Sequence, residues 1–270
     1  VGEHLSKLDF PTDGGSVDHA ARRFRYVYDM YLRNAGTKTY LSVIPDKNTF
    51  IASQNGYPDK DYKALTERLR SGFPEAKYID ISGLLSSDDF YYTDSHWRQE
   101  GILKVADEIA DKMGAERIGQ CEKHDTGVSF YGVYYGQAAL PHAPDSLFYL
   151  DNAVIRGLKV YNVEISSDIP VYDLGAAAGR DPYEMFLGGA RSIIRITNPN
   201  AAQERRLIVF RDSFGSSIAP LLAAGYSEIT LVDIRYISPL SLGKLIDFTK
   251  ADDALFLYSA SVINNSETIK

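Results

Sequence analysis

The chain has little cysteine, little tryptophan and no excess of positive charge. Its one cysteine, Cys121, excludes an internal disulfide and any metal site built from several cysteines. The formal net charge of -7 argues against nucleic acid and anionic membrane surfaces as partners, because binding to either needs a basic face. No apolar run is long enough to span a bilayer. The remaining composition, 44% hydrophobic and 24% charged, is typical of a globular protein with a sizeable core.

Tyrosine is the residue that the chain has in excess. The sequence contains 19 Tyr and 12 Phe beside one Trp and 3 Met. Tyrosine combines an apolar face with a polar tip, which suits contact with carbohydrate or peptide. Packing in the core and the sheet is the alternative use for most of these rings. The chain begins at Val1 rather than methionine, so we draw no conclusion from the lack of a leader segment.

The hydrophobic spacing predicts alternating strands and helices at both ends of the chain. Continuous apolar runs, typical of buried parallel strands, lie at 39–44, 206–210, 228–233 and 254–258. Helical spacing is present over 17–34, 61–69, 98–113, 216–224 and 240–249, with a short strand predicted over 77–81. Between these parts, about 120–200 is rich in Tyr, Gly and Pro and alternates at 159–165 and 192–196. We therefore expect one α/β domain over 1–270, with a β-rich insertion at about 120–200 that belongs to the same domain.

A serine follows one of the predicted buried strands. Ser213 comes just after the apolar run 207–210, at the carboxyl end of the strand, where open α/β sheets bind their ligands. The helix predicted to follow offers free amide groups and the positive end of its dipole beside the hydroxyl. Ser213 can there attack a carbonyl carbon while its own N–H holds the developing oxyanion. The alternative is that Asp212 and Ser213 only cap the helix.

A carboxylate and an imidazole stand two residues apart in the stretch 91–97. Asp94 can orient His96 and stabilise its protonated form, which leaves the other ring nitrogen to accept a proton from a serine. Two alternatives stay open, a hydrogen-bonded surface or packing histidine and a pair of metal ligands. A third metal ligand would have to be His4, His19, His124 or His142, none of which has a recognisable spacing.

In their order, these stretches resemble the DHHW proteins of bacteria, relatives of the SGNH-hydrolase-like alginate O-acetyltransferases. The resemblance lies first in Asp94-Ser95-His96-Trp97, preceded by Tyr91-Tyr92-Thr93, and in Arg211-Asp212-Ser213-Phe214 far downstream. Further matching blocks are Val43-Ile44-Pro45-Asp46-Lys47, Phe130-Tyr131-Gly132, Phe186-Leu187-Gly188-Gly189 and Asp233-Ile234-Arg235-Tyr236. Together they cover roughly 39–265.

The resemblance implies a three-layer, SGNH-hydrolase-like (flavodoxin-like) α/β fold with a parallel sheet and a β-rich insertion. It implies a Ser-His-Asp triad with Ser213 as nucleophile, His96 as base and Asp94 as orienting acid, and no metal or other cofactor. The reaction would transfer an acyl group, acetyl above all, through an acyl-serine to a sugar hydroxyl, or to water in an esterase. The implied substrate is a carbohydrate polymer or a small acyl ester, with an acyl-donor membrane protein as partner and a location outside the cytoplasm, secreted or membrane-tethered at the cell surface.

Three positions depart from the family pattern. Ser95 stands where the family name expects a first histidine, and Arg211 replaces the glycine of Gly-Asp-Ser. Ala190 follows Gly188-Gly189 where asparagine is expected, which removes one donor to the oxyanion. Gly189 and Asn264, or its neighbour Asn265, are the candidates for that role.

Two arginines and two tyrosines complete the candidate site. Arg211 and Arg235 each end a predicted parallel strand and are candidates to bind an anionic acceptor or the oxyanion, the alternative being a buried ion pair with Asp212 or Asp233. Tyr236 and Tyr131 are candidates for substrate contact, although the aromatic group around Tyr131 can equally serve packing of the insertion. The competing function is a catalytically inactive carbohydrate- or cell-wall-binding module on the same fold. A metal-dependent hydrolase is the third, weaker hypothesis.

Overall fold

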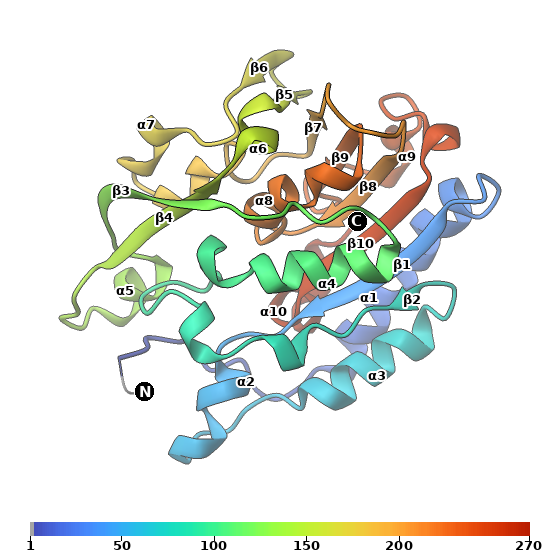
Figure 1. The fold of residues 1–270 in the computed structure, drawn as a ribbon. Coiled ribbons are helices and arrows are strands. Elements are labelled where there is room, and N and C mark those ends of the chain that lie inside the picture. Colours follow the sequence, from blue (N-terminus) through green and yellow to red (C-terminus); the bar gives the residue numbers. More distant parts are fainter. Residues whose placement is uncertain (1–2) are drawn as a thin grey trace.

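The computed structural model describes residues 3–270, so the first two positions of the predicted domain lie outside the described residues. In this part of the chain eight strands form one sheet with helices on both of its faces (Figure 1). Across the sheet the strands follow the order β2 (Lys77–Tyr78), β1 (Lys38–Ile44), β10 (Asp253–Ser259), β8 (Arg206–Arg211), β9 (Glu228–Val232), β7 (Ile193–Thr197), β5 (Lys159–Asn162) and β6 (Ser167–Ile169).

The sheet has a parallel part and an antiparallel part. β2, β1, β10, β8 and β9 run parallel to one another and come from the two ends of the chain. The prediction that continuous apolar runs form buried parallel strands is therefore confirmed. β7, β5 and β6 come from the middle segment and extend the same sheet in antiparallel fashion beyond β9. The middle segment also forms a separate hairpin of β3 (Glu122–Phe130) and β4 (Asp145–Asp151).

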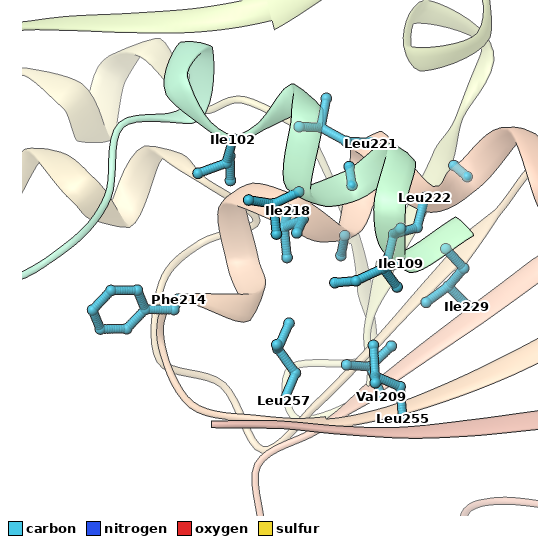
Figure 2. Close-up of a cluster of buried hydrophobic side chains, with 14 of the residues drawn as sticks. Ile102, Ile109, Val209, Phe214, Ile218, Leu221, Leu222, Ile229, Leu255 and Leu257 are labelled. Atoms are coloured by element: carbon cyan, nitrogen blue, oxygen red, sulfur yellow. The ribbon is translucent and has the colours of Figure 1, made fainter. Parts of the chain in front are cut away.

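Helices bury both faces of the parallel strands. One layer is formed by α4 (Leu103–Met113) with the helical segment of α8 (Gly215–Ile218) and η7 (Ala219–Gly225), and the other by α1 (Gly14–Val27), α3 (Tyr62–Gly72) and α10 (Ala260–Asn264). Alternate residues of β10 serve the two layers, since Leu255 and Leu257 pack in the first and Phe256 in the second. Figure 2 shows the first layer, in which Ile109 and Leu222 lie above the strands.

The helix ends follow from residues visible in the sequence. Asp13 caps α1 by accepting the backbone N–H of Ser16, and Gly114 ends α4 in the left-handed conformation that glycine adopts without strain. Short helices occupy the connections, namely α2 (Asn48–Ile51), α5 (Val133–Ala138), α6 (Ala153–Gly157), α7 (Leu174–Ala177) and α9 (Pro239–Leu242). None of the helices formed by residues 3–270 combines the length and apolar character needed to cross a membrane.

Three predicted elements differ from what the spacing indicates. The helix predicted over 240–249 is wrong beyond Leu242, because the Gly243 N–H donates to the Tyr31 hydroxyl and Asp247 caps a separate 3-10 turn. In the helix predicted over 216–224, Pro220 accompanies a change from α to 3-10 geometry. The strand predicted over 77–81 is reduced to β2.

The ring of Phe256 gives a test of this core. It is fully buried in β10, with the rings of Phe24 and Phe210 at centroid distances of 5.1 and 4.5 Å. We predict that Phe256→Ala lowers the free energy of unfolding by about 3–5 kcal/mol, because the cavity left behind cannot collapse fully. Urea denaturation measures the change. The exposed Tyr57 provides the control, since Tyr57→Ala should alter the same quantity by less than about 0.5 kcal/mol, and equal losses would contradict the assignment.

Candidate active site

The turn that carries Ser213 is fixed by the carboxylate next to it. Asp212 is fully buried, and its Oδ1 accepts the Phe214 N–H at 3.1 Å while its Oδ2 accepts the Ser259 N–H at 2.7 Å. The carboxylate thus ties the turn after β8 to the end of the neighbouring strand β10. α8 begins without a side-chain cap, so Ser213 does not serve as the helix cap that the sequence left as the alternative.

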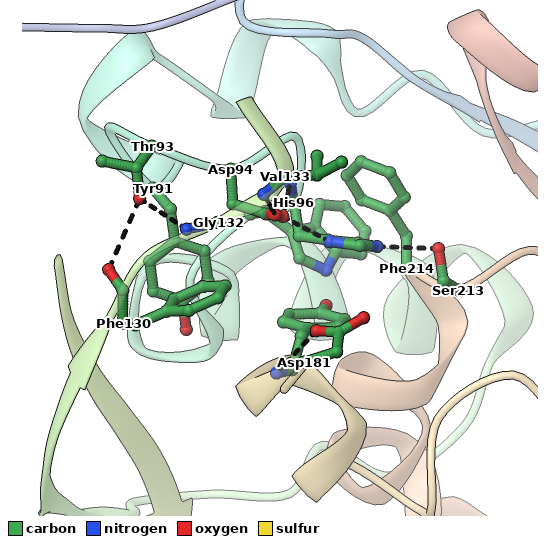
Figure 3. A network of polar contacts seen from close by, with 12 residues as sticks. Tyr91, Thr93, Asp94, His96, Phe130, Gly132, Val133, Asp181, Ser213 and Phe214 are labelled. Atoms are coloured by element: carbon green, nitrogen blue, oxygen red, sulfur yellow. Dashed lines mark hydrogen bonds and ion pairs between the residues drawn. The ribbon is translucent and has the colours of Figure 1, made fainter. Parts of the chain in front are cut away.

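The two distant stretches of the sequence meet at this edge of the sheet. His96 Nε2 lies 2.7 Å from Ser213 Oγ, and His96 Nδ1 lies 2.6 Å from Asp94 Oδ1 (Figure 3). Asp94 Oδ2 accepts the backbone N–H of Val133 at 2.9 Å, so both carboxylate oxygens are held. The His96 side chain is 14% exposed and Ser213 is half-buried. The hydrogen-bonded series Asp94–His96–Ser213 is therefore open to solvent at its serine end.

The charge of Asp94 suits this arrangement. Burial raises the pKa of Asp94, but the neighbouring His96 and the hydrogen bonds from His96 and Val133 outweigh it and bring the pKa down to about 2. The carboxylate is therefore ionised at neutral pH and accepts the proton on Nδ1. His96 Nε2 is then left as an acceptor for the Ser213 hydroxyl proton.

The imidazole is held in place by aromatic rings that the sequence analysis missed. The ring of Tyr183 stacks on His96 at a centroid distance of 3.8 Å and an interplanar angle of 13°, and Phe214 lies 4.7 Å away. Tyr183 Oη and Trp97 Nε1 both donate to Ser217 Oγ at 2.8 Å. Tyr183 belongs to η6 (Pro182–Met185) of the middle segment, and no spacing in the sequence links it to the histidine. Ser217 joins the His96 side of the site to the helix after Ser213.

Two predicted oxyanion donors do not have a free N–H. The Gly189 N–H donates to the Phe186 carbonyl at 3.1 Å inside its own turn, so the prediction for Gly189 is wrong. The Asn264 amide donates to Asp9 Oδ1 and the Pro11 carbonyl, both at 3.2 Å, and that prediction is wrong as well. Asn265 likewise donates to Asp9. The N-terminal segment uses these asparagines as anchors, which their position after the last strand did not reveal.

The two arginines are engaged in charge pairs rather than presented to a substrate. Arg211 is fully buried, 4.0 Å from Asp233, and donates to the carbonyl oxygens of Gly189 and Arg191 at 3.4 Å each. Arg235 donates to both oxygens of Asp233, at 2.9 and 2.7 Å. The buried ion pair that the sequence offered as the alternative is thus the arrangement observed. The prediction that Arg211 binds an acceptor is wrong, because no part of it is exposed.

The remaining tyrosine candidates lie in different surroundings. Tyr236 is 54% exposed, with the Arg235 guanidinium 5.4 Å from its ring, and among the described residues it forms no hydrogen bond or ring contact with Ser213 or His96. Tyr131 is 44% exposed and lines a cleft of about 560 Å³ beside Asp94. The cleft is bordered by Asp94, Phe130, Tyr131, Gly132, Val133, Tyr135, Gly136, Ala176, Gly179, Arg180, Asp181 and Glu184. Since His96 and Ser213 do not border it, the cleft lies on the carboxylate side of the series.

The histidines named as third metal ligands form other contacts. His19 is hydrogen-bonded to Ser266, His124 stacks on Tyr149, and His142 contacts the Ala143 carbonyl. His4 packs against the ring of Tyr92. Over residues 3–270 there is no group of three or more His, Cys, Asp or Glu side chains placed to hold a metal ion.

The family model described as DHHW protein matches residues 81–232, which is more than half of the chain and includes Asp94, His96 and Ser213. The chain therefore belongs to the DHHW protein family. A search of curated proteins finds no match.

Solved structures are similar over nearly the whole chain. A DHHW family protein from Eubacterium siraeum has a TM-score of 0.72 at 16% identity, covering 98% of this chain and 89% of its own. PatB1 from Bacillus cereus, in a structure with a sulfonyl adduct, has a TM-score of 0.75 at 17% identity, covering 96% and 93%. The O-acetyltransferase domain of Pseudomonas putida AlgJ has a TM-score of 0.57 at 12% identity, covering 95% and 87%. At such identities the likeness establishes the fold, and the predicted three-layer, SGNH-hydrolase-like α/β class is confirmed.

Gly132 allows the packing around Asp94 to be tested. A Cβ at this position would lie 2.2 Å from Asp94 Cβ, whereas a Cβ at Gly136 in the adjacent helix would meet nothing within 4 Å. We predict that Gly132→Ala lowers the free energy of unfolding by about 1–3 kcal/mol, because the loop must move away from Asp94. Gly136→Ala should be neutral or stabilise by up to about 1 kcal/mol in the same urea titration. If the two variants have the same stability, Gly132 is not in the close contact described.

Proposed function

We propose that this chain is a serine-dependent O-acyltransferase or esterase that forms an acyl-serine at Ser213, with acetyl as the acyl group. The observation that carries the proposal is the hydrogen-bonded series from Asp94 through His96 to Ser213, with distances of 2.6 and 2.7 Å, at the carboxyl edge of a parallel sheet. The similar fold of a domain named O-acetyltransferase supports the reaction class. The sulfonyl adduct of the PatB1 structure supports a reactive group on this type of fold.

Each residue has one role in the proposed reaction. Ser213 Oγ attacks the carbonyl carbon of the donor ester while His96 Nε2 takes the hydroxyl proton, and Asp94 stabilises the imidazolium. The tetrahedral intermediate collapses, the donor's alcohol leaves with the proton from His96, and the acyl group stays on Ser213. A sugar hydroxyl or water then attacks the acyl-serine, gives its proton to His96, and releases the ester or acid as the proton returns to Ser213 Oγ.

The oxyanion needs hydrogen-bond donors at the serine turn. No described residue accepts a hydrogen bond from the backbone N–H of Ser213, which makes this group the first donor of the proposal. Ser213 precedes the amino end of α8, so its N–H lies in the turn that leads into that helix. The acceptor in this proposal is a carbohydrate, reached outside the cytoplasm, and a membrane protein supplies the acyl groups.

A second candidate function is a catalytically inactive carbohydrate-binding module on the same fold. The observation in its favour is that Gly189 and Asn264, the two further oxyanion donors expected from the sequence, are both occupied by other hydrogen bonds. A site with one oxyanion donor would lose much of the transition-state stabilisation that acyl transfer requires.

Loss of turnover in single-residue variants distinguishes the two functions. We predict that Ser213→Ala and His96→Ala each lower the hydrolysis of p-nitrophenyl acetate by at least about 10³-fold, because each removes a group that acts on the reacting atoms. Initial rates measure the effect, and circular dichroism checks folding. Ser71→Ala and His124→Ala, at partly or fully exposed positions away from the series, are the matched controls and should retain the rate. Equal turnover in all four variants would refute the serine mechanism, and sugar binding without turnover would favour the binding module.

A further inference from the structure

We propose that the cleft beside Asp94 binds one sugar ring of a polysaccharide that is uncharged or bears amino groups, next to the ring that is acylated. This inference rests on the proposed function, because it treats the polymer as the acyl acceptor. The cleft adjoins Asp94 and not Ser213, so a ring bound there is a neighbour of the reacting one. Its volume of about 560 Å³ is in the range of small-molecule sites, roughly 300–1,000 Å³.

The aromatic wall of the cleft offers a surface for a sugar ring. Tyr131 is 44% exposed, and its ring lies 4.5 Å from that of Tyr135, at an interplanar angle of 46°. One face of a hexose is made of C–H groups and stacks on such rings, while the tyrosine hydroxyls remain free for hydrogen bonds. Phe130, by contrast, is fully buried against Tyr91 and belongs to the core.

The charged residues that border the cleft determine which ligand charge it favours. Asp181 and Glu184 border the cleft with Arg180, and none of the three forms an ion pair with another described residue. With the buried Asp94, the residues that border the cleft include three carboxylates and one guanidinium. Carboxylates accept hydrogen bonds from sugar hydroxyls and attract ammonium groups, whereas they repel the carboxylates of a polyuronate. The charges therefore select against uronate polymers.

Isothermal titration calorimetry with three hexasaccharides tests this selection. We expect the wild-type chain to bind a neutral β-glucan or a chitosan hexamer more tightly than an oligogalacturonate. Tyr131→Ala should weaken binding of the preferred hexamer about 5–10-fold, because the stacking surface is lost. Tyr57→Ala, which removes an exposed ring outside the cleft, should leave the affinity unchanged. Glu184→Gln should raise the affinity for oligogalacturonate relative to the neutral hexamer.

The possible outcomes distinguish failure of the cleft assignment from failure of the proposed enzymatic function. Tighter binding of oligogalacturonate, or unchanged affinity in Tyr131→Ala, would overturn the inference even if p-nitrophenyl acetate is hydrolysed. Selective hexamer binding without any Ser213-dependent turnover would support the cleft assignment and refute the proposed function.

A second inference rests on a different observation, a buried lysine that the reaction does not use. We propose that Lys47 is a positioning residue, whose protonated ammonium group holds the loop that carries Asp94 and His96. Its Nζ donates to the carbonyl oxygens of Tyr91, Tyr92 and Asp94 at 2.9, 3.0 and 2.8 Å. An ammonium has three N–H donors, and here each has one carbonyl acceptor.

The surroundings of Lys47 favour this role over that of an ion pair. Only 1% of Lys47 is exposed, and no carboxylate of residues 3–270 lies within 4.0 Å of its Nζ. Its nitrogen lies 5.0 Å from the ring centroid of Tyr134, which adds a cation–π contact. On the amide side of the same loop, Asp145 accepts the N–H groups of Tyr92 and Thr93 at 2.7 and 2.8 Å. The loop is thus fixed from both sides, by a cation on its carbonyls and an anion on its amides.

The protonation of Lys47 links this contact to pH. Burial lowers the pKa of Lys47 to about 7, although Asp94, Asp145 and Asp46 oppose the shift. His4 and Tyr134 are the other titratable groups that face it. A neutral amine keeps two N–H donors, so one of the three carbonyl bonds is lost as the pH rises through about 7. Turnover that depends on the protonated form therefore declines on the alkaline side.

The pH profile of a neutral variant tests the proposal. We expect Lys47→Met to lower kcat/KM for p-nitrophenyl acetate at pH 6.5 by about tenfold or more and to remove the alkaline decline near pH 7, while the acidic limb is retained. Lys60→Met is the matched control, because Lys60 is also buried but pairs with Asp9 and Asp46. Lys60→Met should lower the stability but keep the alkaline limb of the pH profile. If removing any buried charge abolished that limb, Lys60→Met would abolish it too.

Two measurements keep the test informative if Lys47→Met is unstable or the chain has no turnover. In the wild-type chain, the ¹³Cε resonance of Lys47 should titrate with the midpoint of the alkaline limb. Without turnover, faster amide exchange across 93–97 in Lys47→Met than in Lys60→Met would still support the positioning role and refute only the enzymatic function. An alkaline limb retained in Lys47→Met, or unchanged exchange across the loop, would overturn the inference.

Discussion

The buried carboxylate of Asp212 is the constraint on which the candidate site depends. It accepts one N–H from the turn that carries Ser213 and one from the end of β10, so it joins two parallel strands at the edge where the site forms. A buried carboxylate without such partners would be strongly destabilising, and each of its bonds therefore fixes the turn firmly. Because the turn is fixed, the Ser213 hydroxyl lies within hydrogen-bonding distance of His96, which comes from a loop far away in the sequence.

The middle segment is part of the site as well as of the sheet. It supplies the Val133 N–H that holds Asp94, the Tyr183 ring that stacks on His96, and every residue that borders the cleft except Asp94. Without this segment, Asp94 Oδ2 would lose the N–H that it accepts, and His96 would lose the ring that stacks on it. Substrate recognition and the geometry of the proposed reaction therefore depend on the same inserted residues, and a change in one is expected to affect the other.

Much of this arrangement could be predicted, for reasons that differ between its parts. The parallel strands follow from runs of apolar residues, and the meeting of His96 with Ser213 was expected from the order of two conspicuous blocks. The residues that hold His96 and its loop in place could not be predicted. Tyr183 and Lys47 act through tertiary contacts, which the spacing of residues in the sequence does not indicate. The errors at Gly189 and Asn264 have the same origin, because whether an N–H is free depends on partners such as Phe186 and Asp9. The helix expected over 240–249 failed for a similar reason, a tertiary bond from Gly243 to Tyr31.

The two outermost strands of the sheet are very short. β2 spans Lys77–Tyr78 and β6 spans Ser167–Ile169, while the long, apolar strands lie between them. Long exposed strand edges serve as templates on which further chains add, and short edges offer few unpaired backbone groups for such growth. The same strand order that buries the apolar runs in the middle thus protects the folded chain against edge-to-edge aggregation.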